Sequence, residues 1–325
     1  MIPLRDTIPS KNYPVVNTAL IIVNVMVFVI EMAHLPVLNE FIIMYGLVPA
    51  RYTVPEIAVH FSFGQQVFSL VSFMFLHGGF WHILGNMWFL YIFGDNVEDN
   101  LGHARYLLFY LLCGWVSGIT HIIFNWYSQM PTIGASGAVA GVMGAYFILY
   151  PRAKVLTLIP ILFIPYFIEI PAAFFLGIWF LIQFLSAALS SGQVSGIAWW
   201  AHIGGFIFGI VFLKIFHTIP ETGITWKMRK ATSRQRTPRL QVIKPTSAGG
   251  DYDLYGTLEV TPQEAGSGVR KLINIPSGTR KRLFRVTVPP GIRDGTMVRL
   301  AGIGRKIDDE KRGDVYLKVM IRSGY

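Results

Sequence analysis

The chain has 325 residues, of which 53% are hydrophobic and 14% charged, and its net charge is +10. This apolar content excludes an ordinary soluble domain and predicts several membrane spans. The charge is divided unevenly: residues 1–220 hold seven Lys or Arg and eight Asp or Glu, whereas residues 221–325 hold 21 and ten. The sequence therefore predicts a nearly uncharged membrane part and a basic, water-soluble part. A single cysteine, Cys113, excludes an internal disulfide and a multi-cysteine metal site.

Six apolar stretches are long enough to cross about 30 Å of hydrocarbon. They cover residues 15–33, 68–93, 106–126, 133–150, 171–189 and 199–216. The polar N-terminus carries Pro3, Pro9 and Pro14 and does not have the pattern of a cleaved signal peptide. Between the first two spans, residues 35–66 mix apolar residues with prolines, which predicts a segment lying in the membrane interface.

Residues 155–170 are also apolar, but Pro160, Pro165 and Glu169 interrupt them. Because prolines remove helix hydrogen bonds, this stretch is either a poor seventh span or a connector. Basic residues gather on the cytoplasmic side of membrane proteins. Six spans put the N-terminus, Arg152 and the basic residues after the last span on one side, whereas seven spans do not. We therefore expect six spans, with residues 155–170 as an irregular or interfacial connector on the cytoplasmic side.

The fourth span contains a segment of small residues around one hydroxyl, Gly134-Ala135-Ser136-Gly137. Small neighbours suit either close helix packing or a nucleophile that a substrate carbonyl must reach. A partner base would favour the nucleophile, and His202 begins the last span. With six spans, Ser136 and His202 lie at the same depth, just inside the outer end. An ionisable residue within a span is costly and indicates function, so the matched depth favours a catalytic pair over a structural histidine.

At these residues the sequence resembles the rhomboid family of intramembrane serine proteases. The matching motifs are G-x-S-G at residues 134–137, A-H-x-x-G-x-x-x-G at residues 201–209 and H-x-x-x-N at residues 82–86. The resemblance covers about residues 14–218. It implies that Ser136 is the nucleophile and His202 its base, without a third acidic residue.

The resemblance also implies a set of oxyanion-stabilising or substrate-positioning residues. His82 and Asn86 share one helix face, and in the family they help to stabilise the oxyanion together with the backbone N–H of the serine. A polar pair that bonds between spans is the alternative interpretation, and both roles can coexist. Gly134 and Gly137 flank the nucleophile, and His77 resembles another family histidine on the outer side of the second span. The resemblance implies no metal and no cofactor.

The sequence departs from the family pattern at two positions. Ala140 stands where some members carry a tyrosine that stacks on the histidine, so another group must orient His202. The Trp–Arg pair often found in the long first loop is missing, and Arg51-Tyr52 is the nearest local analogue. Glu98 lies in a turn similar to one in the family, and we expect it to form structural hydrogen bonds at the cytoplasmic end rather than to act as a catalytic acid.

Residues 221–250 are polar and basic and predict a linker. Short alternating segments separated by Pro and Gly turns then predict a small all-β domain over residues 251–325. The strands are expected at residues 254–260, 270–275, 283–288, 297–300 and 315–321. This part resembles the C-terminal, client-binding β domain of DnaJ-type co-chaperones, through residues 284–291, 300–304 and 313–317. The sequence contains no His-Pro-Asp motif, so the J domain that recruits a partner chaperone is not expected.

The expected fold is a polytopic α-helical membrane protein, a six-span rhomboid-like bundle over residues 1–220, with a small all-β cytoplasmic domain at its C-terminus. The expected function is that of a serine endopeptidase that cleaves transmembrane segments near their outer ends, in a plasma or inner cell membrane. Its expected partners are membrane-protein substrates, the lipid bilayer and a peptide or protein client on the β domain.

A non-catalytic rhomboid-like adaptor for membrane clients is the alternative, although the intact Ser136 and His202 argue against it. A transporter would need paired intramembrane charges or inverted repeats, and the sequence shows neither. The basic tail lacks an aromatic–basic RNA signature, so nucleic acid is not expected. Phosphate-loop and His-Glu-x-x-His motifs are also missing from the sequence, so neither ATP nor catalytic zinc is expected.

Overall fold

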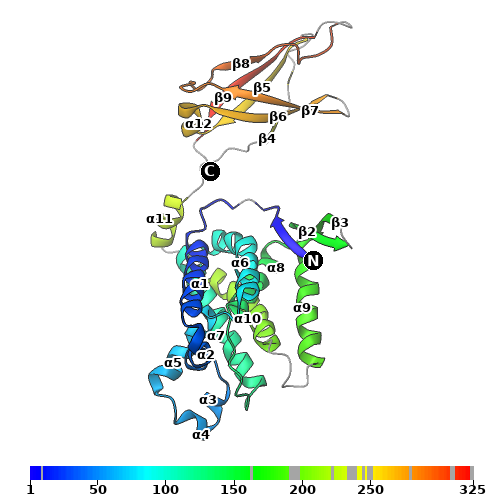
Figure 1. Cartoon of the computed structure of the whole chain (residues 1–325). Coiled ribbons are helices and arrows are strands. Elements are labelled where there is room, and N and C mark those ends of the chain that lie inside the picture. The colour runs from blue at the N-terminus through cyan, green and yellow to red at the C-terminus, as the bar shows by residue number, and fades with distance from the viewer. Residues whose placement is uncertain are drawn as a thin grey trace. The chain divides into compact units, whose positions relative to one another are not determined.

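The computed structural model in Figure 1 covers the whole chain. It describes residues 1–8, 10–161, 164–189, 198–220, 223–232, 240–243, 246, 252–277, 280–307 and 312–322. The chain forms two compact units, Met1–Ser233 and Arg234–Tyr325, which are described separately. Most of the connection between the fifth and sixth predicted spans, residues 190–197, and parts of the predicted linker lie outside the described residues.

The first unit is a bundle of apolar helices (Figure 1). Among the described residues, four helices are long and apolar enough to cross a membrane: α1 (Val15–Ala33), α7 (His103–Phe124), α9 (Ala172–Leu189) and α10 (Trp199–Thr218). α5 (Phe63–Ser72) with the 3-10 turn η2 (Phe73–Phe75) and α6 (Phe80–Leu101) meet that test only as a pair, which is bent by 77°. α8 (Ser136–Leu149) is apolar but has only 14 residues. A membrane-type helical bundle is therefore confirmed, while the count of six spans stays a prediction.

The second predicted span, residues 68–93, is wrong as a single helix. The chain leaves the helical conformation between Phe75 and Phe80, where Gly79 has a φ of +154° that L side chains rarely adopt. A run of apolar residues indicates burial in lipid or protein, but it does not show that a helix is continuous. The break places His77 just before the start of α6.

The chain between α1 and α5 forms short helices. They are η1 (Leu35–Val37), α2 (Leu38–Tyr45), α3 (Ala50–Thr53) and α4 (Pro55–Ala58). Arg51 is buried among them: its Nη1 donates to the Met44 carbonyl oxygen at 3.0 Å, and its guanidinium lies 3.7 Å from the centroid of the Phe61 ring. Arg51 therefore joins the short helices to one another.

α8 lies in the interior of the bundle, with ten consecutive buried residues from Gly137 to Tyr146. α10 packs against it at backbone contact distance because glycines face each other. A Cβ added at Gly205 would lie 2.0 Å from the Gly137 carbonyl oxygen, and one added at Gly209 would lie 2.1 Å from that of Gly141. Small residues allow membrane helices to approach this closely. The contact fixes the N-terminal ends of α8 and α10 beside each other.

The strands β2 (Lys154–Ile161) and β3 (Ile164–Pro171) pair antiparallel, and β1 (Ile2–Asp6) pairs with β2 on its other side. The expectation of an irregular connector is therefore wrong, because the described residues of this segment form a regular sheet, whereas the alternative of an interfacial connector stays a prediction. Its prolines are tolerated there. Pro160 lies beyond Leu158, the last residue that pairs with β1, so it removes no hydrogen bond from that ladder.

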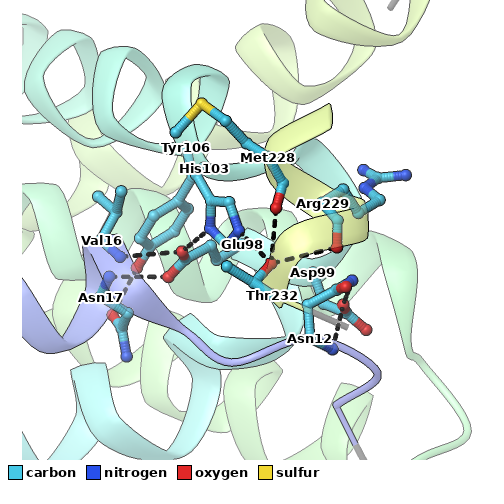
Figure 2. Close-up of polar contacts among 10 residues, drawn as sticks. All are labelled: Asn12, Val16, Asn17, Glu98, Asp99, His103, Tyr106, Met228, Arg229 and Thr232. Carbon is cyan, nitrogen blue, oxygen red and sulfur yellow. Dashed lines mark hydrogen bonds and ion pairs between the residues drawn. The ribbon is translucent and has the colours of Figure 1, made fainter. Parts of the chain in front are cut away.

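A buried polar cluster joins α1, α6, α7 and α11 (Gly223–Thr232), as Figure 2 shows. Glu98, near the end of α6, accepts hydrogen bonds from the backbone N–H groups of Val16 (2.9 Å) and Asn17 (2.7 Å) and contacts His103 Nδ1. The first turn of a helix leaves such N–H groups without partners inside the helix. His103 Nε2 in turn lies 2.7 Å from Thr232 Oγ1. The expected structural role of Glu98 is confirmed, and part of the predicted linker proves to be a helix bonded to the first unit.

The second unit contains two three-stranded sheets, of order β4-β6-β7 and β5-β9-β8. Its elements are β4 (Leu240–Val242), β5 (Leu254–Val260), the short helix α12 (Pro262–Ser267), β6 (Val269–Ser277), β7 (Arg280–Val288), β8 (Met297–Leu300) and β9 (Val315–Ile321). The five predicted strand segments are all strands. Both sheets contribute to one hydrophobic core, with Ile273 and Val286 from one and Leu317 from the other.

Candidate functional site

Ser136 and His202 meet at the N-terminal ends of α8 and α10. Ser136 Oγ lies 2.8 Å from His202 Nε2, which is hydrogen-bonding distance. Both residues are half-buried. Gly137 directly follows the serine and Gly205 comes three residues after the histidine, so the backbone contact between these glycines holds the two side chains together. The structure thus brings together the two residues that the sequence predicts as a dyad.

The turn before Ser136 carries a glycine that contacts a further predicted residue. Gly134 has a φ of +129°, and a Cβ there would lie 2.8 Å from His82 Nε2 and 3.6 Å from Ser136 Oγ. A side chain at this position therefore fits neither the backbone conformation nor the space. The N–H of Gly134 also donates to the Phe73 carbonyl oxygen at 2.8 Å. As a result, His82 lies beside Ser136.

The hydrogen bonds of His82 indicate which ring nitrogen carries the proton. Its Nδ1 lies 3.3 Å from the backbone nitrogen of Gly78, which can only donate. In the neutral ring the proton is therefore on Nε2, the atom that faces Gly134. Asn86, one turn further along α6, donates its Nδ2 to the His82 carbonyl oxygen at 3.0 Å. His82 is thus a donor aimed at the site, while Asn86 bonds within its own helix.

Two other predicted residues pack around this core. His77 donates its backbone N–H to both carboxylate oxygens of Glu31, at 3.1 and 3.0 Å, and its ring lies edge-on to His82 with centroids 5.2 Å apart. Gly137 packs α8 against α7, since a Cβ there would lie 2.0 Å from Ser117 Oγ. His77 therefore contacts the predicted oxyanion donor, and Gly137 sets the helix spacing.

The part of the sequence that holds these residues is similar to a known protein family. Residues 64–219 match the family model of the rhomboid domain, a range that includes every predicted site residue. The membrane part of this chain therefore contains a region similar to the rhomboid domain. Beyond the rhomboid domain, residues 254–324 match the family model of the DnaJ C terminal domain.

Individual rhomboid proteins are also similar to this chain. Rhomboid protein 1, mitochondrial, of Saccharomyces cerevisiae is 28% identical over 69% of this chain and 56% of that protein. RHOMBOID-like protein 12, mitochondrial, of Arabidopsis thaliana is 31% identical over 43% of this chain and 44% of that protein. RHOMBOID-like protein 1 of the same plant is 28% identical over 49% of this chain and 37% of that protein. The chain spans about half the length of the curated relatives it matches.

Inside the rhomboid domain, α9 supplies a contact to His202 that the sequence analysis missed. Gln183 Oε1 lies 2.7 Å from His202 Nδ1. The rings of Trp179 and Trp199 lie 6.0 and 6.2 Å from the imidazole, centroid to centroid. Ala140, where some family members carry a tyrosine, is fully buried in α8. A sequence signal for Gln183 existed, because it is the single amide in an otherwise apolar helix.

A fourth histidine orders the loop that leads to Ser136. His121, near the end of α7, accepts at Nδ1 from Asn125 Nδ2 (3.3 Å), and its Nε2 lies 2.8 Å from Thr132 Oγ1. Thr132 also exchanges two backbone hydrogen bonds with Leu47, of 3.0 and 2.8 Å. These bonds fix both sides of the loop that enters α8 in the rhomboid domain.

Proposed function

We propose that the rhomboid domain is an intramembrane serine endopeptidase in which Ser136 is the nucleophile and His202 its general base. The 2.8 Å distance between Ser136 Oγ and His202 Nε2 carries this proposal. A serine hydroxyl is a weak nucleophile until an adjacent base takes its proton. The small residues around Ser136 leave room for a substrate carbonyl.

In the proposed mechanism, His202 Nε2 takes the Ser136 proton while Oγ attacks the peptide carbonyl carbon. His82 Nε2–H and the free backbone N–H groups in the first turn of α8 donate to the oxyanion, and each such donor is worth about 3 kcal/mol. Asn86 positions His82 by donating its side-chain amide to the backbone carbonyl oxygen of His82. The C–N bond then breaks as His202 gives the proton to the leaving amine, and water hydrolyses the acyl-enzyme by the same steps.

Transmembrane segments of membrane proteins are the proposed substrates, because the site is built inside a bundle of apolar helices. A peptide bond in a regular helix has its carbonyl oxygen hydrogen-bonded and shielded by the next turn. A substrate must therefore unwind locally before Ser136 can reach it. Segments rich in glycine, alanine or proline unwind most easily, so we expect them to be cleaved fastest.

The N-terminal segment, the strands β2 and β3, and α11 lie at one end of the bundle. There β1 pairs with β2, and the backbone N–H of Tyr13 donates to the Thr232 carbonyl oxygen of α11 at 2.9 Å. α8 runs toward this end because it leads into β2, so Ser136 lies toward the other end. The first end is proposed to be cytoplasmic, since it carries Arg5, Lys11 and Arg152.

The apolar helices make this a membrane protein, but they do not identify the membrane. The expectation of a plasma or inner cell membrane has no support from the relatives. The names of two of them, from yeast and from Arabidopsis, place those proteins in mitochondria.

The match to the DnaJ C terminal domain favours a second candidate role, the binding of a peptide or protein client by residues 251–325. Without catalysis, the whole chain would then be a membrane adaptor. The Ser136–His202 hydrogen bond favours the protease, because an adaptor needs no base beside a serine.

Cleavage of a model transmembrane substrate by the full chain, purified in detergent, tests the proposal. Ser136→Ala and His202→Ala should abolish cleavage without changing the melting temperature. Ser186→Ala in α9 is the matched control and should cut at the wild-type rate. Labelling of the wild type by a fluorophosphonate probe should disappear in Ser136→Ala. A wild type that binds several substrates and cuts none of them would favour the adaptor.

A further inference from the structure

Gln183 is a polar side chain in an apolar membrane helix. It is 6% exposed, and α9 contains no charged residue and no other amide. A polar group in a membrane span normally faces the bundle interior and has a function. The Gln183 side chain faces α10 and reaches the one nitrogen of His202 that Ser136 does not use, with Oε1 2.7 Å from Nδ1.

We propose that Gln183 is a positioning residue that fixes the tautomer of His202. This inference rests on the proposed protease function. Its Oε1 can only accept, so the His202 proton stays on Nδ1 and the lone pair of Nε2 is directed at the Ser136 hydroxyl. In the other tautomer Nε2 carries the proton and cannot act as the base. The site is therefore a hydrogen-bonded row of three side chains, Gln183–His202–Ser136, that ends in a neutral amide.

A neutral acceptor suits this location better than a carboxylate. Burying an ionised carboxylate in apolar surroundings costs several kcal/mol unless it is paired with a cation. An amide oxygen accepts the same Nδ1–H bond without that cost. It also cannot take the proton, so the proton received from Ser136 stays on the imidazole until the leaving amine receives it. Gln183 thus supplies orientation and tautomer, and the proton transfer involves only His202.

Two tryptophan rings also contact the His202 imidazole, but they cannot set its tautomer. Trp179 lies one turn before Gln183 on α9, and Trp199 lies three residues before His202 on α10, so each is on the face that meets the imidazole. Their rings are inclined to it by 36° and 89°. Such contacts restrict the position of the ring but do not distinguish Nδ1 from Nε2. That distinction depends on the hydrogen bond to Gln183.

Gln, Met and Glu have side chains of similar length. Comparing them at position 183 therefore distinguishes the effect of the acceptor oxygen from the effect of side-chain packing. Gln183→Met keeps the length and removes the acceptor oxygen. Gln183→Glu keeps an acceptor oxygen whichever way the group is turned, so it should rescue the function. Leu185→Met is the matched control, because it introduces the same residue two positions later on α9 at a side chain that is 48% exposed.

With a model transmembrane substrate, Gln183→Met should lower kcat on the order of 10²-fold, the contribution typical of a general base, with KM unchanged. Labelling of Ser136 by a fluorophosphonate should slow by the same factor. Gln183→Glu should recover most of the loss, and Leu185→Met should match the wild type. Full activity in Gln183→Met, or equal loss in folded Gln183→Met and Gln183→Glu, would overturn the proposal.

A spectroscopic measurement keeps the test independent of cleavage. In protein with ¹⁵N-labelled histidine, at a pH where the ring is neutral, His202 should show a protonated Nδ1 and an unprotonated Nε2. Its signals are assigned by their loss in His202→Ala. Gln183→Met should give a mixture of both tautomers. If the wild type shows the Nδ1–H tautomer but cleaves nothing, the protease proposal fails while the role of Gln183 stands. A wild type with the proton on Nε2 refutes the role of Gln183 whatever its activity.

Discussion

The substitution Gly205→Ala tests whether the contact between α8 and α10 sets the catalytic distance. An added Cβ would lie 2.0 Å from the Gly137 carbonyl oxygen, whereas ordinary contacts begin at 3.4 Å. The obstructing atom is backbone and cannot rotate aside, so the helices must separate by about 1 Å or more. That shift lengthens the 2.8 Å distance between Ser136 Oγ and His202 Nε2 to roughly 4 Å, beyond hydrogen-bonding range. A misplacement of this size lowers the rate on the order of 10²-fold.

The assay compares kcat for a transmembrane substrate and the rate of fluorophosphonate labelling in detergent. Gly85→Ala in α6 is the matched control, because nothing lies within 4 Å of its added Cβ. Both substitutions gain the same helix propensity, about 1 kcal/mol. Gly85→Ala should react at the wild-type rate, and folded Gly205→Ala should react about 10²-fold more slowly. Equal rates for the two variants would show that the glycine contact does not hold the dyad together.

Three more predictions concern other parts of the chain. Gly134→Ala adds a Cβ 2.8 Å from His82 Nε2 at a φ of +129°, and we expect kcat to fall on the order of 10²-fold; steady-state kinetics showing a raised KM with normal kcat would contradict this. Glu98→Ala leaves one buried and one half-buried N–H group at the start of α1 unpaired and should lower the free energy of unfolding by about 2–4 kcal/mol; an unchanged thermal midpoint would show that water satisfies those groups. In the second unit, the N–H of Gly302 and the Arg299 guanidinium hold the pKa of Asp314 below its ordinary value of 3.8. Its stabilising effect is therefore complete above that pH and is lost as the pH falls through the lower folded-state pKa. Protection factors of β9 amides in the full chain, which are exchange rates corrected for the intrinsic pH dependence of amide exchange, should fall on acidification, less so in Asp314→Asn, and equal pH dependence in both proteins would refute it.

Local patterns in the sequence predicted much of the secondary structure. The first apolar stretch, residues 15–33, has the bounds of α1, and the alternating segments 254–260, 297–300 and 315–321 have those of β5, β8 and β9. Hydropathy and alternation succeed here because each depends only on which face of one element is buried. The pairing of Ser136 with His202 was also accessible, since it followed from counting spans and from the family motifs.

The missed features depend on contacts between distant segments. The strands β2 and β3 form a sheet, and its third strand, β1 at residues 2–6, comes from the far end of the chain. The break before α6 arises at Gly79, within a run that is apolar enough overall to be taken for one span. Gln183 stood out in α9 by polarity, but no spacing rule links it to His202, because the two lie on separate helices whose register is set by packing.

The length of α8 makes the depth of the nucleophile a property of the lipid as well as of the protein. Its 14 residues span about 21 Å, against about 30 Å of hydrocarbon in a typical bilayer. Because its C-terminal end leads into the β sheet, the shortfall falls at the Ser136 end. Longer acyl chains place more hydrocarbon above the serine, and shorter chains remove it. For the proposed protease, the same substrate helix would then present a different peptide bond to Ser136 in membranes of different thickness, and acyl-chain length would be a determinant of the cleavage position.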